Sequence, residues 1–227
     1  MKKFKKIIKA LKIRYRRYLL RDEFLIAGAK WFSDRGDQFH RLNYPLHSDS
    51  IVFDIGGYIG DFSEDIYKKF GCKIFLFEPV LSSYLLCIKR FEYNEKIKCF
   101  NFGISSLNEF LKIGVAENVS SFQSPHTGNE IEVVEVKDIT EVIKDLKIKK
   151  IDLVKINIEG DEFKVIPKLI ESGDINKIKY IQIQFHNFVD DAESKRNFIR
   201  SELEKTHTEM WSYYFIWESW KLKDNTT

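Results

Sequence analysis

The sequence predicts an α/β protein built on a doubly wound, mostly parallel sheet. Residues 51–53 form the short apolar run of a strand buried on both faces, and a glycine-rich turn leads from them into a helical run at 61–70. Strand-like and helix-like stretches then alternate along the chain, which is typical of a parallel sheet with helices on both faces. Aromatic runs at 211–217 and 220–223 predict a closing antiparallel hairpin that reverses the last strand.

The composition indicates an ordinary globular protein with one main domain. The chain has 227 residues, of which 44% are hydrophobic and 31% are charged. It contains neither a run of 18 apolar residues nor a signal-peptide pattern, so we expect a cytoplasmic protein without a transmembrane span. The cysteines are odd in number and lack ligand spacing, which predicts reduced structural thiols at Cys72, Cys87 and Cys99.

Pattern changes divide the chain into four parts. Residues 1–21 predict a basic amphipathic helix, and residues 22–50 predict a helical adaptor in which Trp31, Phe32 and His40 pack. Residues 51–222 form the main domain, with a hairpin inserted at 107–137. Residues 223–227 are a frayed tail.

The basic charge is concentrated at the N-terminus. Ten of the 37 Lys and Arg residues lie in residues 1–21, which contain no acid, so the rest has 27 bases against 34 acids and a net charge of −7. An acidic body argues against nucleic acid as a partner. Apolar residues at spacings of three and four form one stripe on this helix: Phe4, Ile7, Ile8, Leu11, Tyr15 and Tyr18. Such a helix can lie in an anionic membrane interface, or it can dock on its own domain or on a second subunit.

The first motif follows the first predicted strand. Asp54 ends that strand, and Gly56, Gly57 and Gly60 form the turn after it. Glycines allow backbone N–H groups to approach a ligand, although the same residues also suit an ordinary turn. Glu78 follows the next predicted strand, 22 residues after Gly56, which is about the spacing at which an acid meets ribose hydroxyls in nucleotide-binding sheets.

The second motif is Ile-Asp-Leu-Val-Lys-Ile-Asn-Ile-Glu-Gly-Asp-Glu, residues 151–162. Polar groups gather at the carboxyl end of a predicted strand at 153–158, and polar groups are costly to bury without partners. We interpret Asn157 and Glu159 as site residues. Asp161 and Glu162 suit capping of the following helix at least as well.

Two further stretches are less specific. A third strand predicted at 97–102 ends at Gly103-Ile104-Ser105, which could border a bound nucleoside or form a plain turn. Strand-like runs at 109–115 and 131–136 predict the inserted hairpin. Its loop contains three residues that could touch a substrate but are more simply solvated, Ser120, Ser121 and His126.

Taken together, three motifs resemble the FkbM family of S-adenosylmethionine-dependent methyltransferases. They are Val-Phe-Asp-Ile-Gly-Gly-Tyr-Ile-Gly-Asp, Phe-Glu-Pro and the second motif above, and the resemblance covers about residues 30–222. It implies a seven-stranded, Rossmann-like class I methyltransferase sheet and methyl transfer to a hydroxyl, often on a sugar or polyketide. The implied cofactor-binding residues are Asp54, Gly56, Gly57, Tyr58, Gly60, Glu78, Pro79, Ile104 and Ser105.

The resemblance also bears on catalysis. His186 follows a fifth predicted strand at 180–185, which ends beside the transferred methyl group in this fold class, and an imidazole with a pKa of ~6.5 suits proton removal. A lone His is also commonly a core or capping residue. We name His186, Glu159 (acting through a water) and Asn157 as candidate catalytic residues. Asn157 replaces the Asp of the family pattern Lys-Ile-Asp-x-Glu-Gly, which puts a base or metal role there in doubt, so we predict no metal.

The leading hypothesis is an S-adenosylmethionine-dependent O-methyltransferase that acts on a sugar hydroxyl of a cell-surface glycan or its precursor. The basic N-terminal helix would place it at the inner face of the membrane. One alternative is a nicotinamide-dependent oxidoreductase, against which the glycine spacing counts. The other is a non-catalytic membrane-surface binding module that keeps the fold. The sequence does not indicate an oligomeric state.

Overall fold

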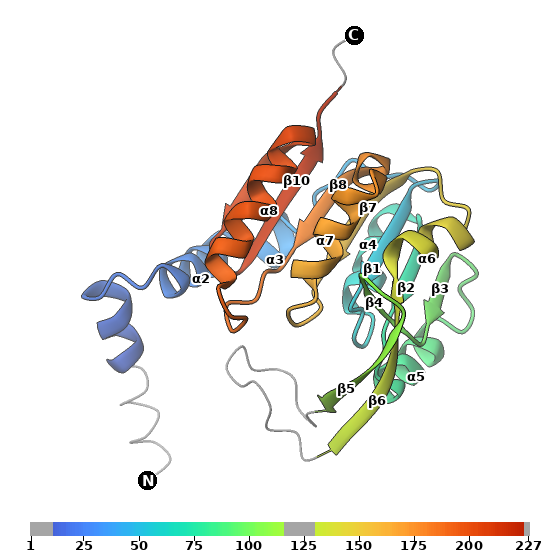
Figure 1. Ribbon diagram of the computed structural model, residues 1–227, viewed down its shortest axis with the longest axis horizontal. Helices are drawn as coiled ribbons and strands as arrows, with labels where there is room; N and C mark the ends of the chain where they lie inside the picture. Colours follow the sequence, from blue (N-terminus) through green and yellow to red (C-terminus); the bar gives the residue numbers. More distant parts are fainter. Residues whose placement is uncertain (1–10, 116–129, 225–227) are drawn as a thin grey trace.

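The computed structural model describes residues 11–115 and 130–224, and a twisted seven-stranded sheet forms its centre (Figure 1). The strand order is β3-β2-β1-β7-β8-β10-β9. Neighbours from β3 to β8 pair in parallel, whereas β10 is antiparallel to both β8 and β9. The doubly wound fold with a reversed last strand is therefore confirmed. The strands are β1 (Ile51–Ile55), β2 (Lys73–Phe77), β3 (Ile97–Phe100), β7 (Ile151–Ile156), β8 (Ile178–Ile183), β9 (His207–Tyr213) and β10 (Trp217–Leu222).

Helices cover both faces of this sheet because alternate strand residues point to opposite sides. On one face, residues such as Phe53 pack with α6 (Ile139–Asp145), α7 (Glu162–Glu171) and α8 (Ala192–Thr206). On the other face, residues such as Val52 pack with α4 (Asp61–Phe70) and α5 (Leu81–Arg90). The strand order changes direction between β1 and β7. In doubly wound sheets ligands bind at such a switch point, in the crevice outside the carboxyl ends of the strands.

A second, three-stranded sheet begins shortly after β3, at Gly103. Its order is β4-β6-β5, with β4 (Gly103–Ser105) parallel to β6 (Glu130–Asp138), and β5 (Glu109–Val115) antiparallel to β6. The third strand predicted at 97–102 is present as β3, but it ends at Phe100, two residues earlier than predicted. The Asn101 side chain donates hydrogen bonds to the carbonyls of Glu78 and Pro79, which turns the chain out of the large sheet. Ser120, Ser121 and His126 lie outside the described residues.

The closing hairpin exists, but its predicted boundaries were wrong. The turn lies at 214–216, where Ile216 N donates to Tyr213 O at 2.8 Å and Phe215 has a φ of 51°. Trp217 is therefore the first residue of β10, and not the last residue of the preceding strand. The aromatic run hides this turn because it contains none of the Gly, Pro or Asn residues that usually mark one.

The adaptor contains α2 (Glu23–Ser33) and the short α3 (Gly36–Phe39). Asp22 caps α2 by accepting from Leu25 N. Trp31 is buried and His40 bonds the Tyr213 hydroxyl, as packing residues should. Phe32 was predicted to pack as well, but it is 74% exposed because it lies on the outer face of the helix. Within the described ranges, none of the helices has both the length and the hydropathy to cross a bilayer.

The three cysteines are free, as predicted. Burial raises the pKa of Cys72 to about 11, that of Cys87 to about 12 and that of Cys99 to about 11. Thiols with such pKa values stay protonated near neutral pH and are poor nucleophiles. All three therefore have structural roles, and Cys87 Sγ donates to Tyr58 O in the turn after β1.

Candidate functional site

The glycine-rich turn between β1 and α4 lies tightly against its neighbours. Gly56 has a φ of +76°, and a Cβ at this position would lie 1.9 Å from Asn157 O, so only glycine fits. Gly56 N and Gly57 N both donate to Phe77 O, at 3.0 and 3.1 Å. The turn is thereby attached to the end of β2, and Tyr58 within it is 45% exposed. The predicted Gly60 stands just before α4 with a φ of 84°.

A buried ion pair lies beneath this turn. Asp54 and Lys155 are register partners on β1 and β7, and Lys155 Nζ lies 3.0 Å from Asp54 Oδ1. Ser63 Oγ donates to the other carboxylate oxygen at 2.7 Å, and Lys155 Nζ donates to Gly56 O at 2.6 Å. Burial lowers the pKa of Lys155, and the Asp54 carboxylate opposes that shift. The predicted binding residue Asp54 thus positions the turn from below, with its side chain 0% exposed.

Glu78 reaches the same turn from the end of β2. Its two carboxylate oxygens accept from Tyr58 N at 2.7 Å and from Val80 N at 2.9 Å. The side chain therefore points towards the glycine-rich turn, as a ribose-binding acid must. Burial raises the pKa of Glu78 to about 7, although the two backbone N–H groups oppose this shift. Each oxygen keeps a free lone pair with which it can accept from a hydroxyl.

This raised pKa predicts a pH-dependent nucleoside affinity. Glu78 accepts hydrogen bonds from ribose hydroxyls best when it is ionised, and about ten elevenths of it is protonated one pH unit below a pKa of about 7. Titration calorimetry with S-adenosylhomocysteine at pH 8, 7 and 6 should show affinity falling about tenfold towards pH 6. The Glu78→Gln variant should bind more weakly at pH 8 and lose the dependence. Equal wild-type affinities at pH 6 and pH 8 would contradict this role.

Three further predicted cofactor residues lie beside β2 and in β4. Pro79 is half-buried, and its carbonyl accepts from the Asn101 amide. Ile104 is 2% exposed, within the main core. Ser105 Oγ donates to Asp161 Oδ2 at 2.7 Å, which ties β4 to the loop before α7. Their contact with adenine stays a prediction.

The loop after β7 has a strained backbone. β7 ends at Ile156, two residues earlier than predicted, because the chain turns into this loop. Glu159 has a φ of 52° and Gly160 a φ of 110°, and left-handed non-glycine residues are concentrated at functional sites. The Glu159 side chain is 72% exposed. Asn157 Oδ1 is buried and accepts no hydrogen bond from any described residue. A polar atom in that state is suited to a ligand.

A buried carboxylate orients His186. Glu162 Oε1 accepts from His186 N at 2.8 Å and lies 3.0 Å from His186 Nδ1, while Glu162 Oε2 accepts from Gly160 N. Glu162 is fully buried, whereas His186 is 12% exposed. Burial acts to lower the pKa of His186, but the Glu162 carboxylate outweighs it, so the pKa is raised. With Nδ1–H directed at Glu162, Nε2 is left as the acceptor, 3.8 Å from Glu159 Oε1.

A polar hollow lies at the loop that follows His186 in the chain. It has a volume of about 450 Å³ and is lined by Arg16, Asp22, Glu23, Phe24, Asn187, Glu193 and Tyr214. Asn187 directly follows His186, and a second hollow shares Asn187, Glu193 and Tyr214. Carboxylates, an amide and a phenol are groups that bond to hydroxyls. Across the described ranges, His, Cys, Asp and Glu form no cluster of three or more that could hold a metal ion.

Two residues of this site were missed or misread in the sequence. Lys155 was not singled out, although a lysine within an apolar central strand requires a buried partner, and Asp54 on the neighbouring strand supplies it. Glu162 was left open between a site role and capping, and it bonds Gly160 N and His186. Asp161 stands before α7 without a side-chain capping bond and pairs with Lys164 instead.

The residues at this point of the sheet fit S-adenosylmethionine on three observations. Glu78 presents a carboxylate beside the glycine-rich turn, with lone pairs free to accept from ribose hydroxyls. Asn157, in the loop after β7, has a buried oxygen that accepts no hydrogen bond from any described residue. All of these groups lie at the switch point of the sheet, where ligands of doubly wound proteins bind.

The chain is similar to solved structures of methyltransferases, and the likeness shows the fold where the TM-score exceeds 0.5. A protein from Clostridium thermocellum assigned as an rRNA methylase is 6% identical, with a TM-score of 0.52 over 85% of this chain and 96% of that one. A protein from Streptococcus mutans assigned as a methyltransferase, in complex with S-adenosylhomocysteine, is 11% identical, with a TM-score of 0.48 over 78% and 91%. The N-methyltransferase NodS from Bradyrhizobium japonicum WM9 is 11% identical, with a TM-score of 0.46 over 86% and 98%. No curated protein matches the chain significantly.

The sequence match is to a family model. The model described as "Methyltransferase FkbM domain" matches residues 54–217, from the buried acid of β1 to the first residue of β10. This span contains every residue of the crevice, and S-adenosylmethionine is the cofactor. The chain belongs to the FkbM family of S-adenosylmethionine-dependent methyltransferases.

Proposed function

We propose that this methyltransferase transfers its methyl group to a hydroxyl oxygen of a sugar, in a cell-surface glycan or its precursor. The observation that carries the proposal is the imidazole of His186, which the buried Glu162 holds with Nε2 free beside the crevice. An alcohol is a poor nucleophile until its proton begins to leave, so O-methyl transfer gains from a positioned base.

His186 takes the acceptor proton at Nε2 while Glu162 stabilises the imidazolium that forms. When bound, S-adenosylmethionine supplies an electrophilic methyl carbon, so the protein mainly has to align the acceptor oxygen and remove its proton. Asn157 contributes an amide oxygen and the turn at Gly56 contributes close-approaching backbone. Glu159 lies within one water of His186 Nε2 and can pass the proton to solvent.

The composition of the polar hollow supports a hydroxyl-rich acceptor. Glu23 and Glu193 offer carboxylate acceptors for sugar hydroxyls, and Tyr214 adds an aromatic ring of the kind on which sugars stack. Asp22 already accepts from Leu25 N and pairs with Arg16. The same carboxylates disfavour a strongly anionic acceptor, because like charges repel at short range. Membership of the FkbM methyltransferase family argues against the alternative of a nicotinamide-dependent oxidoreductase.

The test compares acceptors that differ only in the nucleophilic atom. Purified protein is incubated with methyl-labelled S-adenosylmethionine and either a panel of methyl glycosides or the matching amino sugars. We expect label on hydroxyl oxygens, located by mass spectrometry of the products. Label on amines alone would overturn O-methyl transfer. Tight S-adenosylhomocysteine binding without transfer to any acceptor would favour the non-catalytic alternative.

A further inference from the structure

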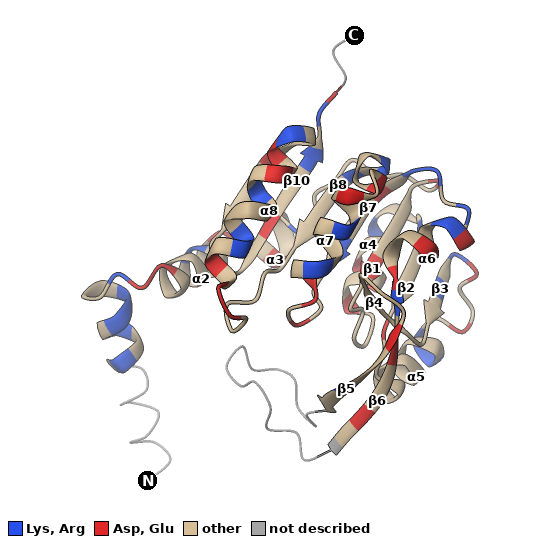
Figure 2. Cartoon of the chain, viewed as in Figure 1, with Lys and Arg blue, Asp and Glu red and all other residues tan. Residues whose placement is uncertain are grey.

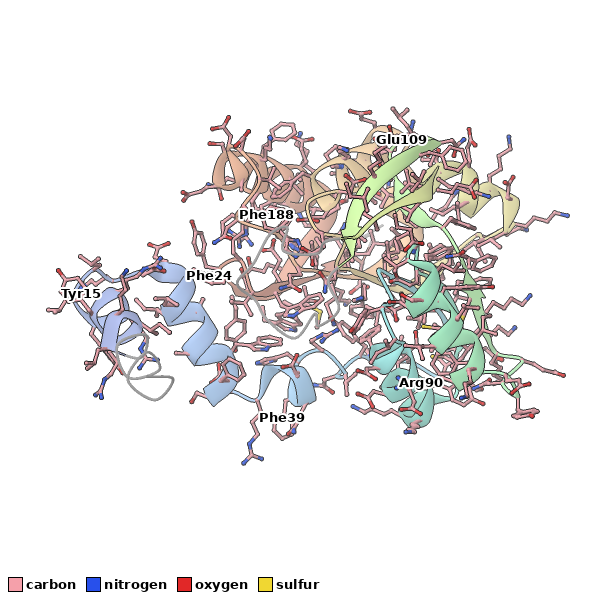
Figure 3. All side chains as sticks on the ribbon, turned by 90° about the horizontal axis from the view of Figure 1, so that it is seen from below. Tyr15, Phe24, Phe39, Arg90, Glu109 and Phe188 are labelled. Carbon is pink, nitrogen blue, oxygen red and sulfur yellow. The ribbon has the colours of Figure 1, made fainter. Side chains whose placement is uncertain are left out.

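The N-terminal basic segment, residues 1–21, is described from residue 11 onward. Residues 11–18 form a helix that projects from the body of the domain, and Tyr15 lies at its outer end (Figure 3). Leu11, Tyr15 and Tyr18 occupy one helical stripe and are 61%, 53% and 64% exposed. Leu19 and Leu20, in the turn that follows the helix, are 72% and 62% exposed as well. The alternative that this stripe packs on its own domain is therefore not observed for residues 11–20.

The basic residues of this segment indicate which kind of surface its exposed apolar stripe contacts. The exposed bases Lys12 and Arg14, with Arg17 beside them, flank the apolar stripe, and residues 1–21 contain ten bases and no acid. Figure 2 shows the blue helix standing apart from a body of mixed charge. Apolar side chains beside many bases suit the interface of an anionic bilayer, where each nearby base contributes ~1 kcal/mol. The rest of the chain has a net charge of −7 and is repelled by an anionic surface. Attachment is therefore confined to the N-terminal segment.

The segment lies next to the site. Arg16 lines the polar hollow together with Asn187 and Glu193, at the carboxyl end of β8. In Figure 1 the helix stands at the side of the molecule where the loops after β7 and β8 emerge. A bilayer that holds the segment is therefore also close to the edge of the sheet that contains the crevice.

We propose that the described part of the basic segment, residues 11–21, binds the surface of an anionic bilayer and brings the methyl-transfer site to acceptors carried in that surface. The acceptor is then an amphiphile, with its hydroxyl-bearing head at the interface and an apolar tail in the membrane. This acceptor class rests on the proposed function, whereas bilayer binding does not.

Vesicle binding of the whole chain tests the proposal. Sedimentation with vesicles of phosphatidylglycerol and phosphatidylcholine should retain the protein, and vesicles of phosphatidylcholine alone should not. The triple variant Lys12→Gln, Arg14→Gln, Arg17→Gln should lose about 10²-fold in partition coefficient. The matched control Lys144→Gln, Lys147→Gln, Lys149→Gln removes three exposed lysines from the opposite edge of the sheet and should bind as wild type does.

Two readouts separate this inference from the proposed function. The triple variant should methylate a water-soluble glycoside at the wild-type rate but a lipid-linked glycoside on anionic vesicles much more slowly. Equal vesicle binding by wild type and triple variant would overturn the inference whatever the activity. A wild-type dimer in analytical ultracentrifugation that the change Leu11→Ser, Tyr15→Ser, Tyr18→Ser dissociates, without vesicle binding, would assign the stripe to a second copy and overturn it too.

Discussion

Replacing His186 by alanine is expected to lower kcat for methyl transfer by about 10²–10⁴-fold, the range that positioned general bases contribute. The S-adenosylhomocysteine affinity should stay unchanged, because His186 contacts Glu162 and not the glycine-rich turn. Single-turnover kinetics with a reactive acceptor and calorimetry on the same preparation measure the two quantities. His47→Ala is the matched control, since this exposed histidine lies before β1 at the opposite edge of the sheet.

The Glu162→Gln variant tests whether Glu162 positions His186 for catalysis or only supports the fold. The Glu162 carboxylate raises the pKa of His186, so its removal should lower that pKa. The neutral imidazole is the reactive form, and the acidic limb of the kcat profile should therefore move to lower pH even as the maximum falls. A purely structural residue would lower the maximum without moving the limb. The double variant His186→Ala, Glu162→Gln should be no slower than His186→Ala, because the two act as a unit.

A kcat within a factor of two of wild type for His186→Ala would contradict the base assignment. Activity would then depend on alignment by the crevice, and Glu159 would be the next group to test, since it lies 3.8 Å from the same nitrogen. Glu159 is largely exposed, so Glu159→Gln leaves the fold intact and gives a clean measurement.

The local sequence pattern was sufficient to predict the first strands and the first helix of the main sheet. The helix at 61–70 and the strand at 73–77, before Glu78, were predicted with the observed bounds because each is bordered by glycines or by a charged helix end. β1 was found as well, but it continues to Ile55, past the predicted apolar run at 51–53. Predictions failed where a tertiary contact sets the boundary. The bend at Asn101 depends on carbonyls of Glu78 and Pro79, more than twenty residues away, and no local signal marks it.

The residues of the site also fall into those that local sequence predicts and those that depend on tertiary contacts. Glu78 could be found by spacing, because ribose contact requires an acid at the end of the second strand. The pairing of Glu162 with His186 joins residues 24 positions apart, and it appears only once β8 lies beside β7. Sequence alone therefore showed two acids that suit a helix start, whereas one of them, Glu162, is the partner of the candidate base.

Replacing Lys155 by methionine is expected to lower the free energy of unfolding by about 3–5 kcal/mol, since it leaves the Asp54 carboxylate buried without its counter-charge. Methionine keeps most of the side-chain volume, so the loss reports the charge and not a cavity. Urea denaturation measures it. Lys150→Met is the surface control: Lys150 pairs with Asp152 near the start of β7, but its side chain is 63% exposed, and its loss should cost at most about 1 kcal/mol.

The same variant tests whether the ion pair also shapes the cofactor site. Lys155 Nζ bonds Gly56 O, so its loss should loosen the glycine-rich turn and weaken S-adenosylhomocysteine binding even in protein that remains folded. Arg196→Met is the matched control, because Arg196 and Glu218 form a second buried pair, at 3.0 Å, between α8 and β10. Glu218 keeps a second partner in Arg200, so this change should cost less stability than Lys155→Met and leave the affinity intact. Equal losses of affinity in both variants would mean that the turn responds to global stability and that Lys155 has no particular role in shaping it.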